Sequence, residues 1–582
     1  MELKSCYKKD GKFFDKVREP NDTVKWAKER FEALGDKVFE EAVRIDKGRL
    51  DIPVYISKYT PEAIRMTGTP KQMGKGATPE QAEASAVMEL AERYSLFHFK
   101  HAVPKRLATM DELEGNRVSL DELFLSLHVV PKTREERSAI ENALRSLPME
   151  WVKAYSLVDK SPFWLPWNWF WTINEFNGSA AGNSIEEATV QALCELVERH
   201  VCSLVTYERA KTPTIDPASF THPMANELIE KFKRVGVNLV LKDFTMGMGV
   251  PSVGAIAWDP TTFPHRSEIV YAAGTAPEPE RAAIRAITEV AQLAGDFDTD
   301  GKYVESGLPK FSTLEEAQYV LDGDSVVSIH QLPNLGDDDF RKEVENIAST
   351  LEVRGLHSYI VDIRHPELQV PAVYAVIPGN HFRDRTINGD MVFHMAKLAV
   401  QLEDKEVARA FLDALDQQFP SRYYIAFYRA YCQENLGNRE AAVDLYREAL
   451  RRGPDPVEVA SIHCHLGACY REIGDYDAAI LELNEAKKIN PGLKEVYNLL
   501  GNCYYKLGRY VEAVQEFEQA ISIDPSSAID YANIGANLRM LGLKEAAIKW
   551  YEMALALDPA LEWASCHLRE LEEESKRIKC ES

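Results

Sequence analysis

The last third of the chain repeats a pattern every 34 residues, and this repeat limits the folds that the region can adopt. Small residues and proline recur at this step in four sets: Gly467, Gly501 and Gly535; Gly474, Gly508 and Gly542; Ala479, Ala513 and Ala547; and Pro491, Pro525 and Pro559. Small residues at fixed positions are typical of places where two helices pack closely. The repeat therefore predicts helical hairpins that stack one upon the next, each ended by Asp-Pro or Asn-Pro.

The period of 34 residues is that of tetratricopeptide repeats. We predict an all-α repeat domain over residues 386–582, with clear repeats over about residues 459–559. A degenerate unit precedes them, because Gly437 lies 37 residues upstream of Gly474. We expect this domain to bind a protein partner.

Strand and helix patterns alternate in the longer N-terminal part of the chain. Runs such as LDIPVYIS (residues 50–57) and IVYAAGTA (residues 269–276) have the β-branched and aromatic content of buried strands. Helical patterns follow both runs. The alternation predicts a mixed α/β (α+β) catalytic domain over residues 1–385.

Residues 183–199 encode a helix with a polar stripe along an otherwise apolar surface. The stripe consists of residues at helical spacing: Asn183, Glu187, Gln191, Glu195 and Glu198. Glu195 and Glu198 are like charges on adjacent turns, which is unfavourable unless a cation or a basic group lies between them. The stripe is therefore expected to face something other than bulk water.

Two more predicted helices carry the same kind of polar face. Its members are Ser85, Glu89 and Glu92 on one helix, and Arg285 and Glu289 on the other. Lys75 stands between two glycines just before the first helix. Carboxylates gathered in this number need Mg²⁺ to neutralise them, and Lys75 and Arg285 would then bind phosphate oxygens. Because the chain has no GxxxxGK[ST] motif, the pattern predicts an ATP site unlike a P-loop.

These stretches resemble the YcaO superfamily in sequence and in order. The matching motifs are GKGAT (74–78), SAVMELAER (85–93), the helix of residues 183–199, RAITE (285–289) and VPAVYAVIPG (370–379). The resemblance covers about residues 1–385. It implies an enzyme that uses ATP and Mg²⁺ to activate a peptide backbone amide. A nucleophile adds to the carbonyl carbon, ATP phosphorylates the carbonyl oxygen, and loss of phosphate leaves an azoline, an amidine or a thioamide.

The resemblance also implies roles for individual residues. The expected ATP contacts are Lys75, Ser85, Glu92, Asn183, Gln191, Glu198 and Arg285. The expected Mg²⁺ ligands are Glu89, Glu92, Glu187, Glu195, Glu198 and Glu289. No residue is assigned as a catalytic acid, base or nucleophile.

Two absences bear on the expected product. Azoline-forming members often end in a PxPxP tail, whereas this chain ends in ELEEESKRIKCES and has no proline after Pro559. It also has no fused peptide-binding partner domain. We therefore expect a thioamide made with an external sulfur nucleophile, supplied by a sulfur-delivery or TfuA-like partner. The alternatives are an azoline-forming cyclodehydratase and an ATP-binding accessory or scaffold factor for ribosomal-protein methylthiolation.

Composition limits the partners and the compartment. The formal net charge of -23 argues against a surface that coats nucleic acid. The nine cysteines form no CxxC pair, which suits reduced thiols. We find neither a signal peptide nor an apolar run that spans a bilayer, so we expect a soluble cytoplasmic protein. Its expected partner is a peptide or protein substrate, and a homodimer is an open alternative.

Overall fold

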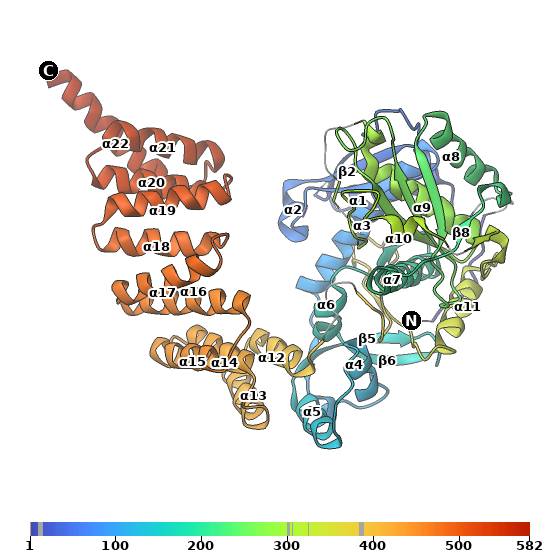
Figure 1. The fold of residues 1–582 in the computed structure, drawn as a ribbon, viewed down its shortest axis with the longest axis horizontal. Coiled ribbons are helices and arrows are strands. Elements are labelled where there is room, and N and C mark those ends of the chain that lie inside the picture. The colour runs from blue at the N-terminus through green and yellow to red at the C-terminus, as the bar shows by residue number, and fades with distance from the viewer. Residues whose placement is uncertain are drawn as a thin grey trace. The chain divides into compact units, whose positions relative to one another are not determined.

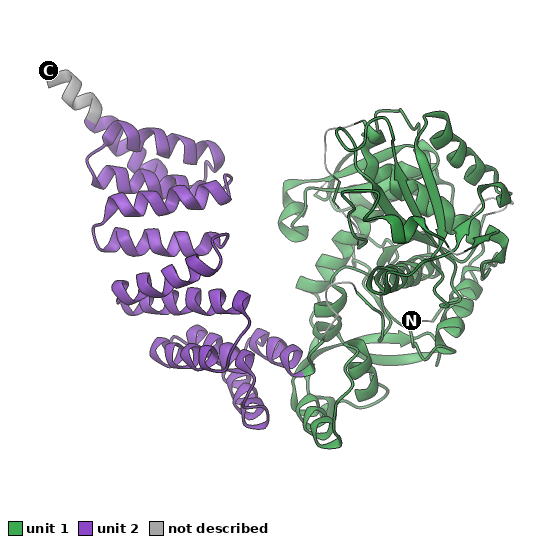
Figure 2. Cartoon of the chain, in the orientation of Figure 1, with its two compact units in different colours: residues 1–391 green, residues 392–582 purple. Residues whose placement is uncertain are grey.

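The computed structural model describes residues 2–9, 15–35, 37–298, 303–304, 307–323, 325–382 and 389–581. The chain divides into two compact units, residues 1–391 and 392–582 (Figures 1 and 2). The predicted domain boundary at residues 385 and 386 lies outside the described residues.

The first sheet of the N-terminal unit supports the first motif helix. It is antiparallel, in the order β1 (Phe39–Arg44), β2 (Val54–Tyr59) and β3 (Lys71–Lys75). The predicted strand of residues 50–57 thus begins later, at Val54. Helix α3 (Pro79–Ala102) packs on β2 and β3, and α1 (Pro20–Glu32) and α2 (Pro61–Thr67) pack on α3. The Thr78 side chain caps α3 by accepting a hydrogen bond from the Gln81 N–H.

The second sheet supports the third motif helix. Its order is β11 (Val270–Thr275), β10 (Ser252–Trp258), β9 (Asn238–Asp243), β8 (Thr214–Ile215) and β12 (Val326–Val327). Strand β11 confirms the strand predicted at residues 269–276. Helix α9 (Pro279–Ala294) packs on β10 and β11, beside α8 (Pro223–Arg234).

The third sheet completes the unit. Its order is β4 (Arg106–Ala108), β5 (Met149–Ser156), β13 (Tyr359–Asp362), β14 (Ala372–Val376) and β7 (Ser179–Ala181), with β6 (Ser161–Pro166) on β5. The connections between its strands hold the short helices α4 (Leu120–Ser126), α5 (Arg134–Ser146) and α6 (Trp167–Asn174).

Helix α7 (Ile185–Glu208) lies at the centre of the N-terminal unit (Figure 1). It contacts β7 and β14 of the third sheet, β10 and β11 of the second sheet, and helix α11 (Phe340–Glu352). Leu193, Leu196 and Val197 are fully buried, as an apolar helix between two sheets requires. Sequence positions on α7 therefore face different sheets at different turns.

Two motif helices approach their strands through glycine. A Cβ placed on Gly74 of β3 would overlap the backbone of Ala82 and Ala86 in α3. In the same way, a Cβ on Gly274 of β11 would overlap the backbone of Ala282 and Ala286 in α9. These glycines are needed because a side chain there would hold the helix away from its sheet.

The C-terminal unit is entirely helical (Figure 2). Its helices are α12 (Met391–Gln401), α13 (Lys405–Gln418), α14 (Tyr423–Asn435), α15 (Arg439–Arg451), α16 (Pro456–Ile473), α17 (Tyr476–Ile489), α18 (Lys494–Lys506), α19 (Tyr510–Ile523), α20 (Ala528–Met540), α21 (Lys544–Leu557) and α22 (Glu562–Glu581). Consecutive helices pack as hairpins, from α14 with α15 to α20 with α21.

The 34-residue step reappears in the packing of these hairpins. Three glycines of the first helices lie against large side chains of the second helices, in the pairs Gly467 with Leu483, Gly501 with Phe517 and Gly535 with Tyr551. The predicted fold class, an α/β region followed by an all-helical repeat region, is confirmed. Among the described residues, no helix combines the length and apolar character needed to cross a bilayer.

Replacing Gly274 by alanine tests the strand-to-helix contact. We expect Gly274→Ala to lower the free energy of unfolding by about 1–3 kcal/mol, because the new methyl group would meet backbone atoms. Thermal unfolding measures the change. Gly355 is the control position: it has φ of +74° and no atom within 4 Å of a built Cβ. The free energy of unfolding of Gly355→Asn should stay close to that of the wild type, because asparagine tolerates this backbone conformation. Equal stability of Gly274→Ala and the wild type would contradict the role of the contact.

Candidate functional site

The end of β3 meets helix α9 through opposite charges. Lys75, the last residue of β3, forms an ion pair with the Glu289 carboxylate. On the same helix, the Arg285 guanidinium donates a hydrogen bond to the Gln191 side-chain oxygen of α7. These contacts bring the predicted lysine, the third motif helix and the central helix together.

Helices α3 and α7 meet at the turn that enters β7, whose first residue is Ser179. The Ser179 hydroxyl donates to the Glu92 carboxylate over 2.6 Å. The neighbouring Gly178 N–H donates to Glu195 over 3.1 Å. Arg93 lies 3.6 Å from Glu92 and 3.9 Å from Glu89. The turn thus holds carboxylates of both helices in place.

Glu198 ties α7 to the end of β11. Its carboxylate accepts a hydrogen bond of 2.9 Å from the Thr275 N–H. One turn earlier on α7, Glu195 lies 3.6 Å from the Arg199 guanidinium. The two carboxylates predicted to need a positive neighbour are therefore anchored by a backbone N–H and by arginine.

Burial disfavours the charged forms of the glutamate and lysine side chains in this region. Burial raises the pKa of Glu92 to about 8, and the nearby Glu89 and Glu195 carboxylates push it the same way. Burial also raises the pKa of Glu89 and of Glu198. In the opposite sense, burial lowers the pKa of Lys75 to about 8. The ionised forms of these glutamates are therefore costly unless an added positive charge stabilises them.

The charges of the cluster act on one another across four elements. Glu198 and Glu89 raise the pKa of Lys75, whereas Arg285 lowers it. Lys75 and Arg285 in turn lower the pKa of Glu198, and Glu195 raises it. Side chains from β3, α3, α7 and α9 thus form one electrostatic unit, which we call the carboxylate cluster. Its members are Lys75, Glu89, Glu92, Gln191, Glu195, Glu198, Arg285 and Glu289.

The carboxylate cluster suits a nucleotide with Mg²⁺. Its half-buried carboxylates Glu89, Glu92 and Glu198 have raised pKa values, and a divalent cation would stabilise their ionised forms. The Arg285 Nε is buried and has no hydrogen-bond partner in the described residues, so it can donate to a phosphate. Within the same residues, no three His, Cys, Asp or Glu side chains converge closely enough to hold an ion. Each carboxylate of the cluster instead accepts a hydrogen bond from, or lies in ion-pair range of, a protein group named above.

Two of the predicted residues lie at the start of α7, apart from the carboxylate cluster. Asn183 accepts a hydrogen bond of 3.0 Å from the Thr23 hydroxyl, and its amide donates to Glu187 over 3.2 Å. Glu187 also accepts from the Val17 N–H over 3.1 Å and lies 3.5 Å from the Lys16 ammonium. These residues thus hold the N-terminal segment.

The distance along the helices explains the separation. Glu195 follows Glu187 by eight positions of α7, which is about 12 Å along the helix axis. Gln191 stands halfway between them and is bonded to Arg285. Ser85 lies one turn before Glu89 on α3 and is half-buried.

Sequence reasoning missed the N-terminal segment and the backbone donors. Lys16, Val17 and Thr23 belong to a polar stretch whose pattern gives no sign of a site. The N–H groups of Gly178 and Thr275 are invisible in a sequence, because nearly every residue has one. Arg93 and Arg199, which lie beside the carboxylate cluster, could have been found from the sequence, since they lie at helical spacing from the glutamates.

The sequence matches known families in both parts of the chain. Residues 73–381, more than half of the chain, match the family model described as YcaO cyclodehydratase, ATP- and Mg²⁺-binding. Tetratricopeptide-repeat models match residues 393–456, 467–508 and 495–527. The α/β region and the repeats predicted from sequence are thus confirmed as YcaO and tetratricopeptide regions.

Two relatives are similar to part of this chain. A Rhizobium leguminosarum bv. trifolii protein, described as an uncharacterized protein in the tfuA 3′ region, is 27% identical over 335 residues, or 53% of this chain and 76% of the relative. The ribosomal protein S12 methylthiotransferase accessory factor YcaO of Escherichia coli (strain K12) is 24% identical over 236 residues, or 38% of this chain and 39% of the relative.

A solved structure shares the fold of the N-terminal unit. It is a heterocyclase in complex with substrate and cofactor, with a TM-score of 0.54 and 22% identity. The likeness covers 66% of this chain and 54% of the heterocyclase, so this chain spans about half the length of that protein.

Protons should leave the site when ATP and Mg²⁺ bind. Because the pKa of Glu92 is about 8, this carboxyl is mostly protonated at pH 7. A cation beside it favours the carboxylate, so binding should release up to about one proton at pH 7 and tighten as the pH rises toward 8. Calorimetry in buffers of different ionisation enthalpy measures the release.

Two variants make this test specific. Glu92→Gln should abolish most of the proton release. Glu83→Gln should not change it, because Glu83 lies on the same helix but pairs with Lys28 at the surface. Binding heat that is independent of the buffer in the wild type would contradict the expectation.

Proposed function

The chain belongs to the YcaO family, and from this premise we propose that it uses ATP and Mg²⁺ to convert a peptide backbone amide into a thioamide. The observation that carries the proposal is the carboxylate cluster. It gathers half-buried charged groups from four elements in one place and leaves the glutamates short of positive charge. A cluster without a ligand would only destabilise the fold.

The residues of the carboxylate cluster take different roles in this proposal. Lys75 and Arg285 bind phosphate oxygens, and Gln191 holds the Arg285 guanidinium in position. The Mg²⁺ ligands come from the glutamates of α3, α7 and α9: Glu89, Glu92, Glu195, Glu198 and Glu289. Ser85, Asn183 and Glu187 act at the ends of the site, where Asn183 and Glu187 already hold the N-terminal segment.

ATP supplies the phosphoryl group that turns the amide oxygen into a leaving group. Sulfide forms a bond to the amide carbon, the carbon–oxygen bond breaks, and oxygen leaves with the phosphoryl group as phosphate. The balanced products are a thioamide, phosphate and ADP. Lys75 and Arg285 stabilise the negative charge that develops on the phosphate oxygens.

Buried cysteines support an external source of sulfur. Burial raises the pKa of the Cys194 thiol to about 12, and it raises the pKa of Cys202 as well. Both thiols therefore stay protonated near pH 7 and are poor nucleophiles. Cys194 lies on α7 among the cluster residues, yet it packs as part of the core. The relative from the tfuA 3′ region suggests a TfuA-like protein as the sulfur-delivering partner.

Azoline formation is the second candidate. It is favoured by the description of the matching family model as a cyclodehydratase. In that reaction a cysteine, serine or threonine of the substrate supplies the nucleophile, and the carboxylate cluster serves the same purpose.

An accessory role, like that in the description of the Escherichia coli relative, would leave the amide unchanged. In each case the tetratricopeptide repeats would recruit the protein partner.

Neutralising one glutamate should weaken nucleotide binding. Glu198→Gln keeps the shape of the side chain and its bond to the Thr275 N–H, but removes a charge from the cluster. We expect the affinity for ATP with Mg²⁺ to fall about tenfold or more, since a lost charge-assisted contact costs about 1.5–3 kcal/mol. Calorimetry with the non-hydrolysable analogue AMPPCP and Mg²⁺ measures the loss. Glu208→Gln, at the far end of α7, should bind AMPPCP and Mg²⁺ with the affinity of the wild type. Unchanged affinity in Glu198→Gln would remove this residue from the site.

Mass spectrometry of the product separates the candidate reactions. Isotopically labelled sulfide, ATP and Mg²⁺ are supplied with the peptide substrate and the sulfur-delivering partner. Thioamide formation should make the peptide heavier by the difference between labelled sulfur and oxygen. Loss of one water without label would establish azoline formation instead. An unchanged peptide mass, with ATP bound, would favour the accessory role.

A further inference from the structure

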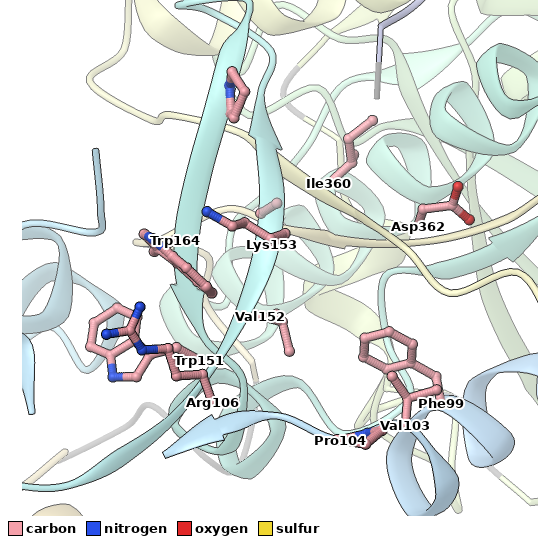
Figure 3. A pocket seen from close by; sticks show the side chains of 12 residues that line it. Phe99, Val103, Pro104, Arg106, Trp151, Val152, Lys153, Trp164, Ile360 and Asp362 are labelled. Atoms are coloured by element: carbon pink, nitrogen blue, oxygen red, sulfur yellow. The ribbon is translucent and has the colours of Figure 1, made fainter. Parts of the chain in front are cut away.

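The third sheet has a gap along one edge of β5. Strand β6 pairs with β5 over residues 151–156 on the other edge. On the edge with the gap, β4 pairs with residues 149–151 and β13 pairs with residues 155–156. Within the described residues, no strand pairs with residues 152–154 on this edge. A pocket of about 620 Å³ opens there (Figure 3).

The backbone of Lys153 points into this gap. Lys153 lies opposite Trp164 of β6, but the Trp164 N–H and C=O bond to Asn116 and Val118 instead. The pair of Lys153 and Trp164 is therefore a non-hydrogen-bonded pair of the antiparallel ladder. It follows that the Lys153 N–H and C=O face away from β6, toward the missing strand.

Neither neighbouring strand can complete the ladder. Continued in its register, β4 would place Pro104 opposite Lys153, and proline has no N–H to donate. Continued in its register, β13 would place Asp362 there, but its pairing with β5 stops at Ile360. The Lys105 ammonium holds the chain before β4 at the end of α3, by donating to the Val103 carbonyl and two others. The gap is thus built into the fold.

The walls of the pocket are mostly apolar, and its rim is basic. Phe99, Val103, Val152 and Ile360 line it. Figure 3 shows Lys153 beside Trp164, with Phe99 and Asp362 across the opening. A pocket of this size and polarity suits a small apolar group flanked by polar contacts.

The rim carries two positive charges, and the Arg106 guanidinium donates a hydrogen bond of 3.1 Å to the Glu112 carbonyl. The Lys153 ammonium lies 3.6 Å and the Arg106 guanidinium 5.6 Å from the centre of the Trp164 ring. In the part of the chain that the structure describes, neither of the two forms an ion pair with a carboxylate. The one carboxylate of the pocket, Asp362, is paired with Arg364 over 2.7 Å. The rim therefore complements an acidic ligand.

One residue that lines the pocket, Phe99, belongs to the same helix, α3, as Glu92 of the carboxylate cluster. Phe99 follows Glu92 by seven residues of α3, which is about 10 Å along the helix axis. An extended peptide covers this distance in about three residues. A peptide whose amide lies at the carboxylate cluster can thus extend to the pocket.

We propose that this pocket binds a segment of the peptide substrate near the modified amide, in extended conformation, with an apolar side chain between acidic residues. The peptide backbone bonds to the N–H and C=O of Lys153, the apolar side chain enters beside Phe99 and Ile360, and an acidic residue pairs with Lys153 or Arg106. The proposal rests on the proposed function, because it assigns the ligand as substrate. It adds a preference in the substrate sequence that the carboxylate cluster does not provide.

Charge reversal at the rim tests the pocket. The probe is a fluorescent blocked pentapeptide with a central phenylalanine and a glutamate two residues away on each side, so that the three side chains lie on one face of the extended peptide, and its counterpart has lysines in place of the glutamates. Fluorescence anisotropy with the full chain should show that the wild type binds the glutamate peptide about tenfold more tightly. Lys153→Glu should reverse this preference. Lys132→Glu, which makes the same charge change at an exposed position outside the pocket, should keep it.

A modified peptide tests the backbone contact. Methylation of the phenylalanine nitrogen removes the N–H that would bond to the Lys153 carbonyl, so affinity for the wild type should fall about tenfold. Equal binding of the two charged peptides, failure of both to bind, or no effect of the methyl group would overturn the proposal.

Nucleotide binding in the same variants separates this proposal from the proposed function. Lys153→Glu should bind AMPPCP and Mg²⁺ as the wild type does, because Lys153 lies outside the carboxylate cluster. If nucleotide binds but the peptide preference does not reverse, the pocket assignment is wrong. If the preference reverses but the wild type binds no nucleotide, the proposed function is wrong while the pocket stands as a peptide site.

Discussion

The burial of like charges on neighbouring helices is the constraint on which the N-terminal unit depends. Glu89, Glu92 and Glu198 have raised pKa values because they are removed from water and because each lies near the Glu195 carboxylate. A fold can tolerate such groups only if donors are placed around them or a ligand brings charge. Here the donors are backbone N–H groups at Gly178 and Thr275 and a few arginines and lysines. The three sheets place these donors, and so the architecture serves the site.

The close approach of helix and strand makes this arrangement possible. Gly74 and Gly274 let α3 and α9 lie directly on β3 and β11, and the residues that follow them, Lys75 and Thr275, reach the carboxylate cluster. The glycines therefore help to form the site, because each one lets its strand end beside a helix that carries acidic residues. Helix α3 also extends from the cluster to the gap in the third sheet. One helix can therefore align a peptide with both places.

The sequence pattern had pointed to every residue of the carboxylate cluster, for a physical reason. A polar stripe on an apolar helix must face a partner, and three such stripes on separate helices indicated a shared site. The polar stripe was less informative at the start of α7, where it did not show which neighbour each residue contacts. Asn183 and Glu187 continue the stripe of α7, yet in the structure they bond to Thr23 and Val17 rather than to the cluster. Helical spacing alone cannot show which turns face which neighbour.

The amino-acid sequence alone was enough to predict the repeat period, the interleaved strands and helices, and the acidic faces of three helices. Each of these is local, because periodicity depends on residues within a few turns or strands. The tertiary structure alone decided which faces meet, which backbone donors reach the glutamates, and where the third sheet leaves Lys153 without a strand partner. These features join residues far apart in the chain, such as Pro104, Lys153 and Asp362. Their pairing depends on strand register and on the path of the chain between strands, and no local pattern encodes either one.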